Sequence, residues 1–209
     1  HWALKTGMLM ELSEQFILDC TPNPEECGGT GGCGGGTAEL AYARLIELGG
    51  IPTEWEYPYV SILGNESTCH GLPLAVESPH AGVPAAAANV TGYWHTRENS
   101  YEDMMMALVK MGPLAVSVDA SWHDYESGIF DGGNLTNPNL DHLVQLVGYG
   151  TENGVDYWTL RNSWTPLWGE SGFIRIKRYD PRRGETAPCG MDLTPQDGNG
   201  CKGGPPQVK

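Results

Sequence analysis

The stretch that decides the fold is Asp141-His-Leu-Val-Gln-Leu-Val147, together with Tyr157-Trp-Thr-Leu-Arg-Asn-Ser-Trp164 further along the chain. Each stretch contains an apolar run rich in β-branched and aromatic residues, which predicts strands over residues 143–149 and 155–161. His142 stands where the first strand begins, and Asn162 stands where the second one ends. If the two strands are neighbours in a sheet, these two side chains lie close together.

A histidine beside an asparagine is chemically useful at such a place. The Asn162 side-chain oxygen could accept a ring N–H and so fix the tautomer of His142, while Trp164 covers the pair from water. Activated-nucleophile catalysis needs a base that is oriented in this way. The alternative is a strand-end histidine whose ring is hydrogen-bonded to backbone, and the local sequence leaves both interpretations open.

The remaining pattern is helical first and β-rich later. The early part predicts a helix tail that stops at Gly7, a helix over 14–19 capped by Ser13, and a helix capped by Thr37. A further helix opens at Ser100 with a capping-box pattern and stops at Gly112, and strands follow over 114–118 and 172–177. We therefore expect an α+β protein with a helical subdomain over residues 1–78 and a β-rich subdomain over 79–209.

Composition excludes several classes of protein. The 209 residues carry 12 Lys and Arg against 26 Asp and Glu, and this formal charge of −14 argues against a nucleic-acid partner. With 40% apolar residues, seven Trp and nine Tyr, the chain is rich enough in packing material to fold. No apolar run approaches the roughly 20 residues of a membrane span.

Cysteines and glycosylation sequons indicate an oxidising compartment. The cysteines form no C-x-x-C pair, so we expect disulfides, no metal and no cofactor. Three N-glycosylation sequons begin at Asn65, Asn89 and Asn134. The expected location is a lysosome-like or vacuolar compartment, or the cell exterior. The six cysteines are Cys20, Cys27, Cys33, Cys69, Cys189 and Cys201.

The other histidines have no matching partner in the sequence. We expect each of them to be solvated surface: His1, His70, His80, His95 and His123.

Several motifs together resemble the papain-like cysteine peptidases. They are Leu12-Ser-Glu-Gln-Phe-Ile-Leu-Asp-Cys20, Gly32-Cys-Gly-Gly-Gly36, Glu56-Tyr-Pro-Tyr59, Asp141-His142, Asn162-Ser-Trp164 and Trp168-Gly-Glu-Ser-Gly172. They occur in the family's order and cover almost the whole chain. The resemblance implies a two-subdomain papain-like fold, with a helical left subdomain, a β-barrel-like right subdomain and an active-site cleft between them. It also favours the catalytic interpretation of His142.

The resemblance assigns roles to individual residues. His142 matches the catalytic histidine, Asn162 the residue that orients it, and Trp164 the shielding indole. Trp168 matches the aromatic residue on the leaving-group side. The substrate-binding positions include Gly35 and Gly36, which bind the extended substrate backbone, and Ala38, Leu140 and Leu143, which form the walls of an apolar specificity pocket. Asp141 and Trp168 are the other substrate-binding positions.

Two departures from the family pattern concern the nucleophile. The family's cysteine lies in a C-G-[SA]-C-[WY] signature about 130–150 residues before the histidine, yet no cysteine precedes Cys20. The glutamine of the oxyanion hole is missing as well. We therefore expect residues 1–209 to be a fragment, truncated at the N-terminus and at the C-terminus.

The resemblance also implies a disulfide pattern. Cys20 pairs with Cys69, whereas Cys33 loses its partner unless Cys27 takes it. Cys189 either pairs with Cys201, or both pair with residues beyond Lys209.

The expected function is that of a cysteine-type endopeptidase. It would hydrolyse protein or peptide substrates through a cysteine thiolate, a His142 imidazolium and an acyl-enzyme intermediate. Expected partners are a pro-segment, as in a zymogen, or a cystatin-type inhibitor, and the expected state is a monomer. The alternative is a catalytically silent homologue that acts as a binding or scaffold protein.

Overall fold

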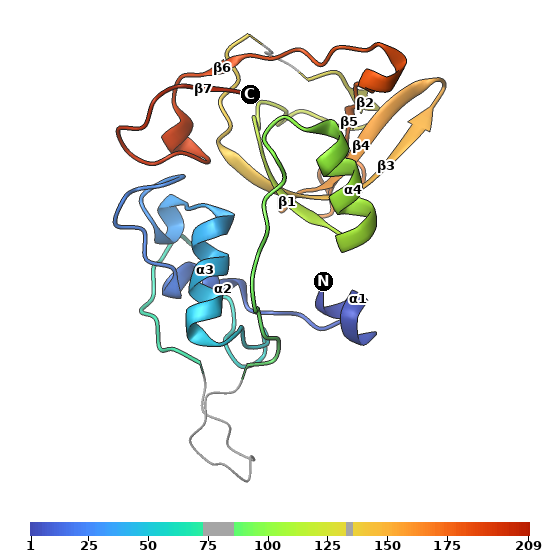
Figure 1. Cartoon of the computed structure of the whole chain (residues 1–209). Helices are drawn as coiled ribbons and strands as arrows, with labels where there is room; N and C mark the ends of the chain where they lie inside the picture. The colour runs from blue at the N-terminus through green and yellow to red at the C-terminus, as the bar shows by residue number, and fades with distance from the viewer. Residues whose placement is uncertain (73–85, 133–135) are drawn as a thin grey trace. The chain divides into compact units, whose positions relative to one another are not determined.

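A computed structural model describes residues 1–72, 86–132 and 136–209 (Figure 1). The chain forms two compact units: a helical unit, Trp2–Trp94, and a β-rich unit, His95–Lys209 together with His1. The subdomain boundary that the sequence predicted, between residues 78 and 79, lies outside the described residues.

Local capping signals define the helices of the helical unit. The Ser13 hydroxyl accepts the Phe16 amide N–H at 2.9 Å and starts α2, and Thr37 caps α3 in the same way. Gly49 adopts the left-handed conformation, with φ of 86°, and ends α3. The predicted caps at Ser13 and Thr37 are confirmed, and α2 ends one residue later than predicted. The elements are α1 (Trp2–Thr6), α2 (Glu14–Cys20), η1 (Gly32–Gly34) and α3 (Ala38–Leu48).

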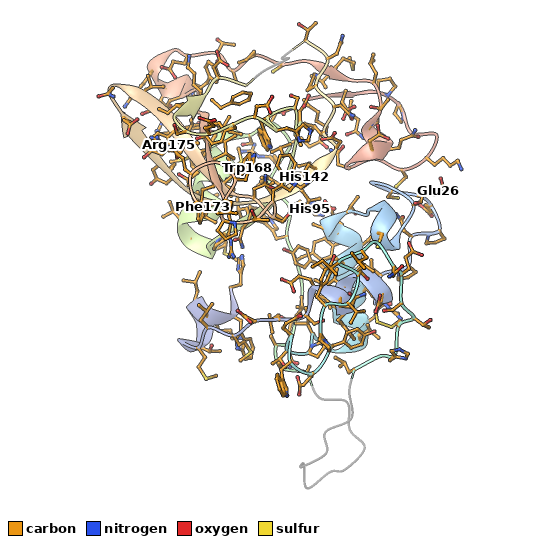
Figure 2. All side chains as sticks on the ribbon, turned by 180° about the vertical axis from the view of Figure 1, so that it is seen from behind. Glu26, His95, His142, Trp168, Phe173 and Arg175 are labelled. Carbon is orange, nitrogen blue, oxygen red and sulfur yellow. A yellow bond between two sulfur atoms is a disulfide. The ribbon has the colours of Figure 1, made fainter. Side chains whose placement is uncertain are left out.

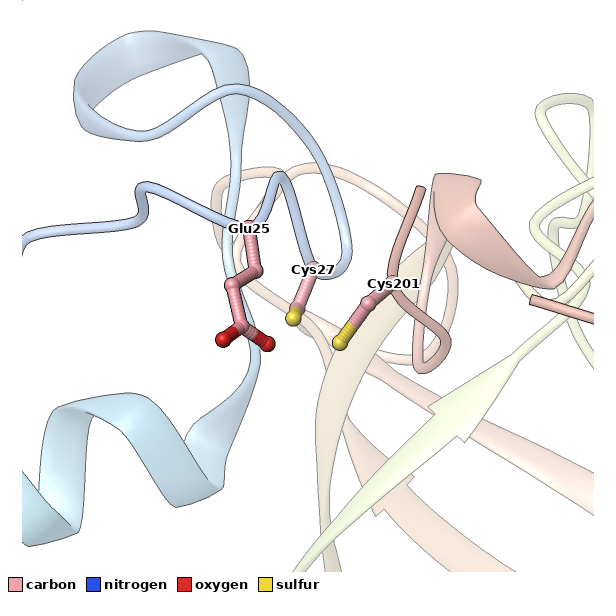
Figure 3. A group of neighbouring side chains, drawn as sticks. All are labelled: Glu25, Cys27 and Cys201. Carbon is pink, nitrogen blue, oxygen red and sulfur yellow. The ribbon is translucent and has the colours of Figure 1, made fainter. Parts of the chain in front are cut away.

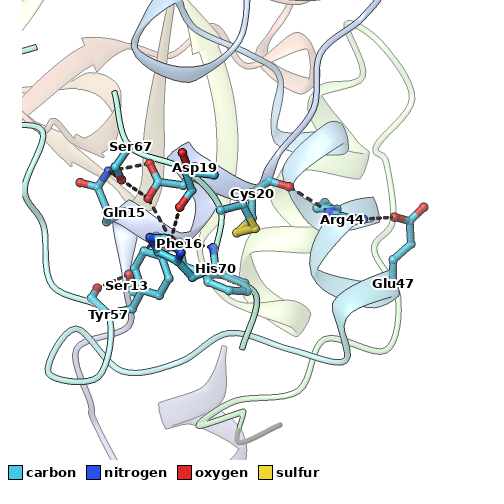
Figure 4. Close-up of a disulfide and its surroundings, with 12 residues drawn as sticks. Ser13, Gln15, Phe16, Asp19, Cys20, Arg44, Glu47, Tyr57, Ser67 and His70 are labelled. Atoms are coloured by element: carbon cyan, nitrogen blue, oxygen red, sulfur yellow. Dashed lines mark hydrogen bonds and ion pairs between the residues drawn. A yellow bond between two sulfur atoms is a disulfide. The ribbon is translucent and has the colours of Figure 1, made fainter. Parts of the chain in front are cut away.

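The core of the helical unit is built around Phe16, which is completely buried. Leu45 of α3 and Ile51 pack in the same cluster. The Cys20–Cys69 disulfide joins the end of α2 to the later loop, and it is the pairing that the family resemblance implied (Figure 4). The cross-link and the apolar cluster therefore stabilise the same region of this unit.

The β-rich unit contains a five-stranded sheet in the order β1-β3-β4-β5-β2. The predicted strands are confirmed, and two of them have the predicted ends, whereas the two-residue strands are too short to leave a sequence pattern. The strands are β1 (Leu114–Val118), β2 (Ile129–Phe130), β3 (His142–Glu152), β4 (Val155–Arg161), β5 (Phe173–Lys177), β6 (Met191–Asp192) and β7 (Gln207–Val208). Two short helical turns, η2 (Pro181–Arg183) and η3 (Pro195–Asp197), complete the unit.

One helix, α4 (Tyr101–Met111), packs on the core of this sheet through Leu108 (Figure 1). Ser100 caps α4 as predicted, by accepting the Asp103 amide N–H. The reciprocal half of the capping box is not formed, because the Asp103 carboxylate binds the Arg97 side chain at 2.7 Å instead. This hydrogen bond lowers the pKa of Asp103 to about 2.

Among the described residues, no helix combines the length and the apolar character that crossing a membrane requires.

Candidate active site

The site centres on His142, the first residue of β3. Strands β3 and β4 are antiparallel, with Gln145 opposite Arg161, so the start of β3 lies beside the residue that follows β4. That residue is Asn162, and its Oδ1 lies 2.8 Å from His142 Nε2. The predicted juxtaposition is therefore present. His142 and Trp168 are both labelled within the β-rich unit in Figure 2.

A second donor establishes which amide atom of Asn162 faces the histidine. The Ser163 amide N–H donates to Asn162 Oδ1 at 2.8 Å, and a backbone N–H identifies its partner as an oxygen. His142 Nε2 must therefore carry a hydrogen and donate to this oxygen. In the neutral ring, Nδ1 then holds the lone pair, and it has no hydrogen bond within the part of the chain that the structure describes. Nδ1 is thus the atom that can take up a proton.

Asn162 itself is held rigidly. Its side chain is buried, and its backbone N–H donates to the Gly172 carbonyl at 2.9 Å. Burial limits competition from water, so the hydrogen bond to His142 is stronger than an exposed one would be. The residue therefore fixes the imidazole from a rigid position.

Aromatic rings cover the pair. The Trp164 indole stacks on His142 with ring centroids 5.1 Å apart and an angle of 27° between the planes. Trp168 meets Trp164 edge-on at 5.2 Å. This arrangement fits the shielding role that the resemblance gave to Trp164.

The segment that leads into His142 is tied to its surroundings. Asp141 Oδ1 accepts the Ala120 amide N–H at 3.1 Å, and the Asn139 amide N–H donates to Asp119 Oδ2 at 3.0 Å. Gly198 approaches the same segment closely, because a Cβ at that position would lie 1.3 Å from the Leu140 carbonyl oxygen. The position of His142 therefore depends on contacts beyond its own strand.

An ion pair supports the loop that carries Trp168. Both Glu170 oxygens accept from the Arg175 guanidinium at 2.7 Å, and Glu170 also accepts the Gly128 amide N–H at 2.9 Å. The Arg175 hydrogen bonds hold the pKa of Glu170 below its ordinary value. Glu170 thus remains ionised in mildly acidic solution and keeps this loop in place.

The predicted substrate-binding residues occur in both units. Leu140, Asp141 and Leu143 flank His142 in the β-rich unit, where Asp141 is exposed and the two leucines are partly buried. Gly35, Gly36 and Ala38 lie at the start of α3 in the helical unit.

The loop of the helical unit that contains Gly28, Gly31, Gly32 and Gly35 (the glycine loop) is tightly folded on itself. Gly35 donates its N–H to the Gly32 carbonyl, and its own carbonyl accepts the Gly31 N–H at 2.8 Å. A Cβ on Gly35 would lie 2.7 Å from the Gly28 carbonyl oxygen. Gly35 is therefore required by the loop itself, whichever ligand the loop meets.

Of the disulfide pairings that the resemblance allowed, Cys27–Cys33 is not formed, so Cys33 lacks a disulfide partner, which is the other alternative it implied. The expectation that Cys189 is disulfide-bonded is wrong. Cys33 and Cys189 are free and exposed. Cys27 is itself disulfide-bonded, so it offers no thiol to Cys33, and the same holds for Cys201 with respect to Cys189. Cys33 sits in the short η1 turn, where its amide donates to the Glu66 carboxylate.

A cysteine binds a metal ion as a thiolate, and a glutamate binds it as a carboxylate. Figure 3 draws Glu25, Cys27 and Cys201. Because both cysteines are disulfide-bonded, neither sulfur supplies a thiolate ligand.

Two sequons are exposed. Asn65 and Asn89 both lie on the surface of the helical unit, whereas Asn134 lies outside the described residues.

The residue that sequence reasoning missed at this site is His123. Its ring stacks on Trp164 with centroids 4.9 Å apart and only 6° between the planes, and its carbonyl accepts the Trp168 indole N–H at 3.1 Å. It is exposed as expected, yet its ring lies on Trp164, which also stacks on His142. No pattern in the sequence signals this contact.

Comparisons with known proteins identify a family and several relatives. A family model described as papain family cysteine protease matches residues 1–196. Cathepsin L of Sarcophaga peregrina is 37% identical over 178 residues, covering 83% of this chain and 48% of that protein. A cathepsin L-like peptidase of Aedes aegypti is 36% identical over 189 residues, covering 88% of this chain and 51% of that protein. The chain thus spans about half the length of these relatives.

A solved structure is similar as well. The bromelain protease from Ananas comosus in complex with the E64 inhibitor matches with a TM-score of 0.69 and 34% identity, over 85% of this chain and 73% of that one.

Proposed function

The chain belongs to the papain family of cysteine proteases, and from this premise we propose that the protein is a cysteine endopeptidase in which His142 serves a cysteine nucleophile. The observation that carries the proposal is the 2.8 Å hydrogen bond between His142 Nε2 and Asn162 Oδ1. It leaves Nδ1 as the basic atom and fixes the plane of the ring, which is what a partner of a thiol needs.

The nucleophile of this proposal is a cysteine outside residues 1–209. The free thiols of the described residues, Cys33 and Cys189, have no hydrogen bond to His142. A thiol that transfers its proton to His142 Nδ1 becomes a thiolate, and the resulting ion pair lowers the pKa of the thiol.

The thiolate sulfur bonds to the carbonyl carbon of the scissile peptide, and the proton on His142 Nδ1 passes to the departing amine. Water attacks the resulting thioester and gives one proton back to His142, and the sulfur leaves as thiolate. Asn162 keeps the Nε2 hydrogen in place throughout. Trp164 covers the pair and limits water access to the hydrogen bond between His142 and Asn162.

Substrate contacts are proposed for each unit by itself. In the helical unit, an extended peptide would bond to backbone groups of Gly36, since those of Gly35 already serve the glycine loop, and Ala38 would contact a substrate side chain. In the β-rich unit, Leu140 and Leu143 would contact an apolar substrate side chain two residues before the cut, with Asp141 and Trp168 further along the substrate.

The expected setting is a lysosome-like or vacuolar compartment, or the cell exterior. The Cys20–Cys69 disulfide supports an oxidising environment during folding. Exposed Asn65 and Asn89 fit N-linked glycans. A pro-segment or a cystatin-type inhibitor would be the protein partner.

The alternative is a silent homologue, and one experiment separates the two. The full-length transcript is sequenced, and the expressed protein is treated at acidic pH with a thiol-reactive epoxide. Two results together support the peptidase. The transcript encodes a cysteine followed by an aromatic residue upstream of residue 1, and one equivalent of the epoxide labels this cysteine in the wild type but not in His142→Ala. His70→Ala, in the helical unit, is the matched control and should label normally. A serine or glycine at that place, or no labelling, overturns the proposal.

A further inference from the structure

Trp164 is in contact with two histidines, of which the mechanism uses only one. His142 and His123 both stack on its indole, at 5.1 Å and 4.9 Å between ring centroids. The His123 ring is almost parallel to the indole, with 6° between the planes, whereas His142 is inclined by 27°. Together with the edge of Trp168, these rings set the plane of Trp164.

Stacking is what places the His123 ring. The side chain is exposed, and its ring nitrogens make no hydrogen bond to any residue that the structure describes. An exposed imidazole with free nitrogens would ordinarily sample several rotamers. Here the ring lies flat on the Trp164 indole. Stacking of this kind orients both rings, so the contact also restrains the indole.

The backbone of His123 is anchored on both sides. Trp122, its neighbour, is 4% exposed and belongs to the core of the β-rich unit. The His123 carbonyl accepts the Trp168 indole N–H at 3.1 Å, and the Ala120 amide donates to Asp141, the residue before His142. The segment that carries His123 is therefore joined directly to the segment that carries His142.

We propose that His123 is a positioning residue, whose ring holds the Trp164 indole against His142 and so keeps the imidazole in the orientation that Asn162 selects. The proposal rests on the proposed function only for its catalytic meaning. The contact itself can be tested without turnover. His123 touches no reacting atom and acts through Trp164.

The test compares His123→Leu, which keeps bulk but removes the planar ring, with His123→Phe, which restores a ring. The chain is labelled with ¹⁵N and ¹³C, and two signals are measured by NMR. They are the nuclear Overhauser contact between the His142 and Trp164 ring protons, and the upfield ring-current shift of His142. We expect His123→Leu to weaken the contact and to lose most of the upfield shift, and His123→Phe to recover both.

A matched control is His70→Leu, because His70 lies over the Tyr57 ring in the helical unit, with centroids 6.4 Å apart. This variant should leave both His142 signals unchanged. If His123→Leu fails to fold, as judged by the Trp122 core resonances, His123→Gln replaces it as the variant without a ring. Wild-type His142 signals in a folded His123→Leu or His123→Gln protein would overturn the proposal, whether or not the protein proves to be a peptidase.

Discussion

The side-chain oxygen of Asn162 accepts two hydrogen bonds of 2.8 Å, one from the His142 ring and one from the Ser163 amide. The same atom thus orients the His142 imidazole and holds the turn after β4. This double use makes Asn162 sensitive to substitution in a way that its neighbour Ser163 is not.

Replacing Asn162 by Ala should impair catalysis in the full-length enzyme. The variant loses a buried hydrogen bond worth about 1–3 kcal/mol, which corresponds to a drop of about 5- to 150-fold in kcat/KM. Ser163→Ala keeps the amide N–H and should retain wild-type kcat/KM on the same peptide substrate. Equal values for the two variants would contradict the orienting role.

Gly198→Ala should destabilise the β-rich unit. The added Cβ would lie 1.3 Å from the Leu140 carbonyl oxygen, so the backbone of the segment that leads into His142 must move. Overpacking of this kind lowers the free energy of unfolding by about 1–3 kcal/mol.

The control for this substitution is Gly92→Ala, because a Cβ there meets no atom within 4 Å. Chemical denaturation followed by circular dichroism measures both variants. The steric argument fails if Gly198→Ala unfolds at the same denaturant concentration as Gly92→Ala.

Much of the fold was predictable because it depends on local signals. Strands β1 and β4 have the predicted ends, since apolar strand patterns stop at turn-forming residues there. The caps at Ser13 and Thr37 are single hydrogen bonds to amides three residues ahead, so they require no tertiary information. The His142–Asn162 pair followed from two strand ends and their antiparallel pairing.

The features that could not be predicted depend on where distant segments pass each other. From the sequence, His123 is expected to be an isolated surface histidine, whereas in the structure its ring stacks on Trp164. In the sequence, Gly198 is not distinguished from the other glycines, of which there are 29 in all, whereas in the structure it lies against the Leu140 carbonyl. Asp103 matched a capping pattern, yet a guanidinium in reach competes better for a carboxylate than a backbone amide does.

Thr165 is strained, and substitutions there should reveal it. It has a φ of +75° although it is β-branched and precedes Pro166, both of which disfavour this conformation. Its hydroxyl accepts the Leu167 amide N–H at 3.2 Å, which holds the turn after Trp164. Thr165→Val keeps the strain and loses this bond, so its free energy of unfolding should fall by about 0.5–1.5 kcal/mol.

Thr165→Gly also loses the hydrogen bond but relieves the strain. The relief is about 1–2 kcal/mol, and glycine's extra chain entropy offsets about 0.5–1 kcal/mol of it. The Gly variant should therefore be more stable than the Val variant by about 0.5–1 kcal/mol in equilibrium denaturation. A Val variant as stable as the Gly variant would show that the turn holds no such strain.

Acid should weaken the loop that carries Trp168 through Glu170. The Arg175 hydrogen bonds lower the pKa of Glu170 in the folded protein below its ordinary value of 4.5. A carboxylate with a lowered pKa contributes its full stabilisation above pH 4.5 and loses it as the pH falls through the folded value. Glu170→Gln should therefore have a lower Tm than the wild type at pH 7, and the difference should shrink steadily below pH 4.5.

Glu126→Gln removes an exposed carboxylate that has no ion pair in the described part of the chain, so its Tm should follow the wild type at every pH. A Tm difference for Glu170→Gln that is constant from pH 7 to pH 3 would mean that ionisation of Glu170 contributes nothing to the loop.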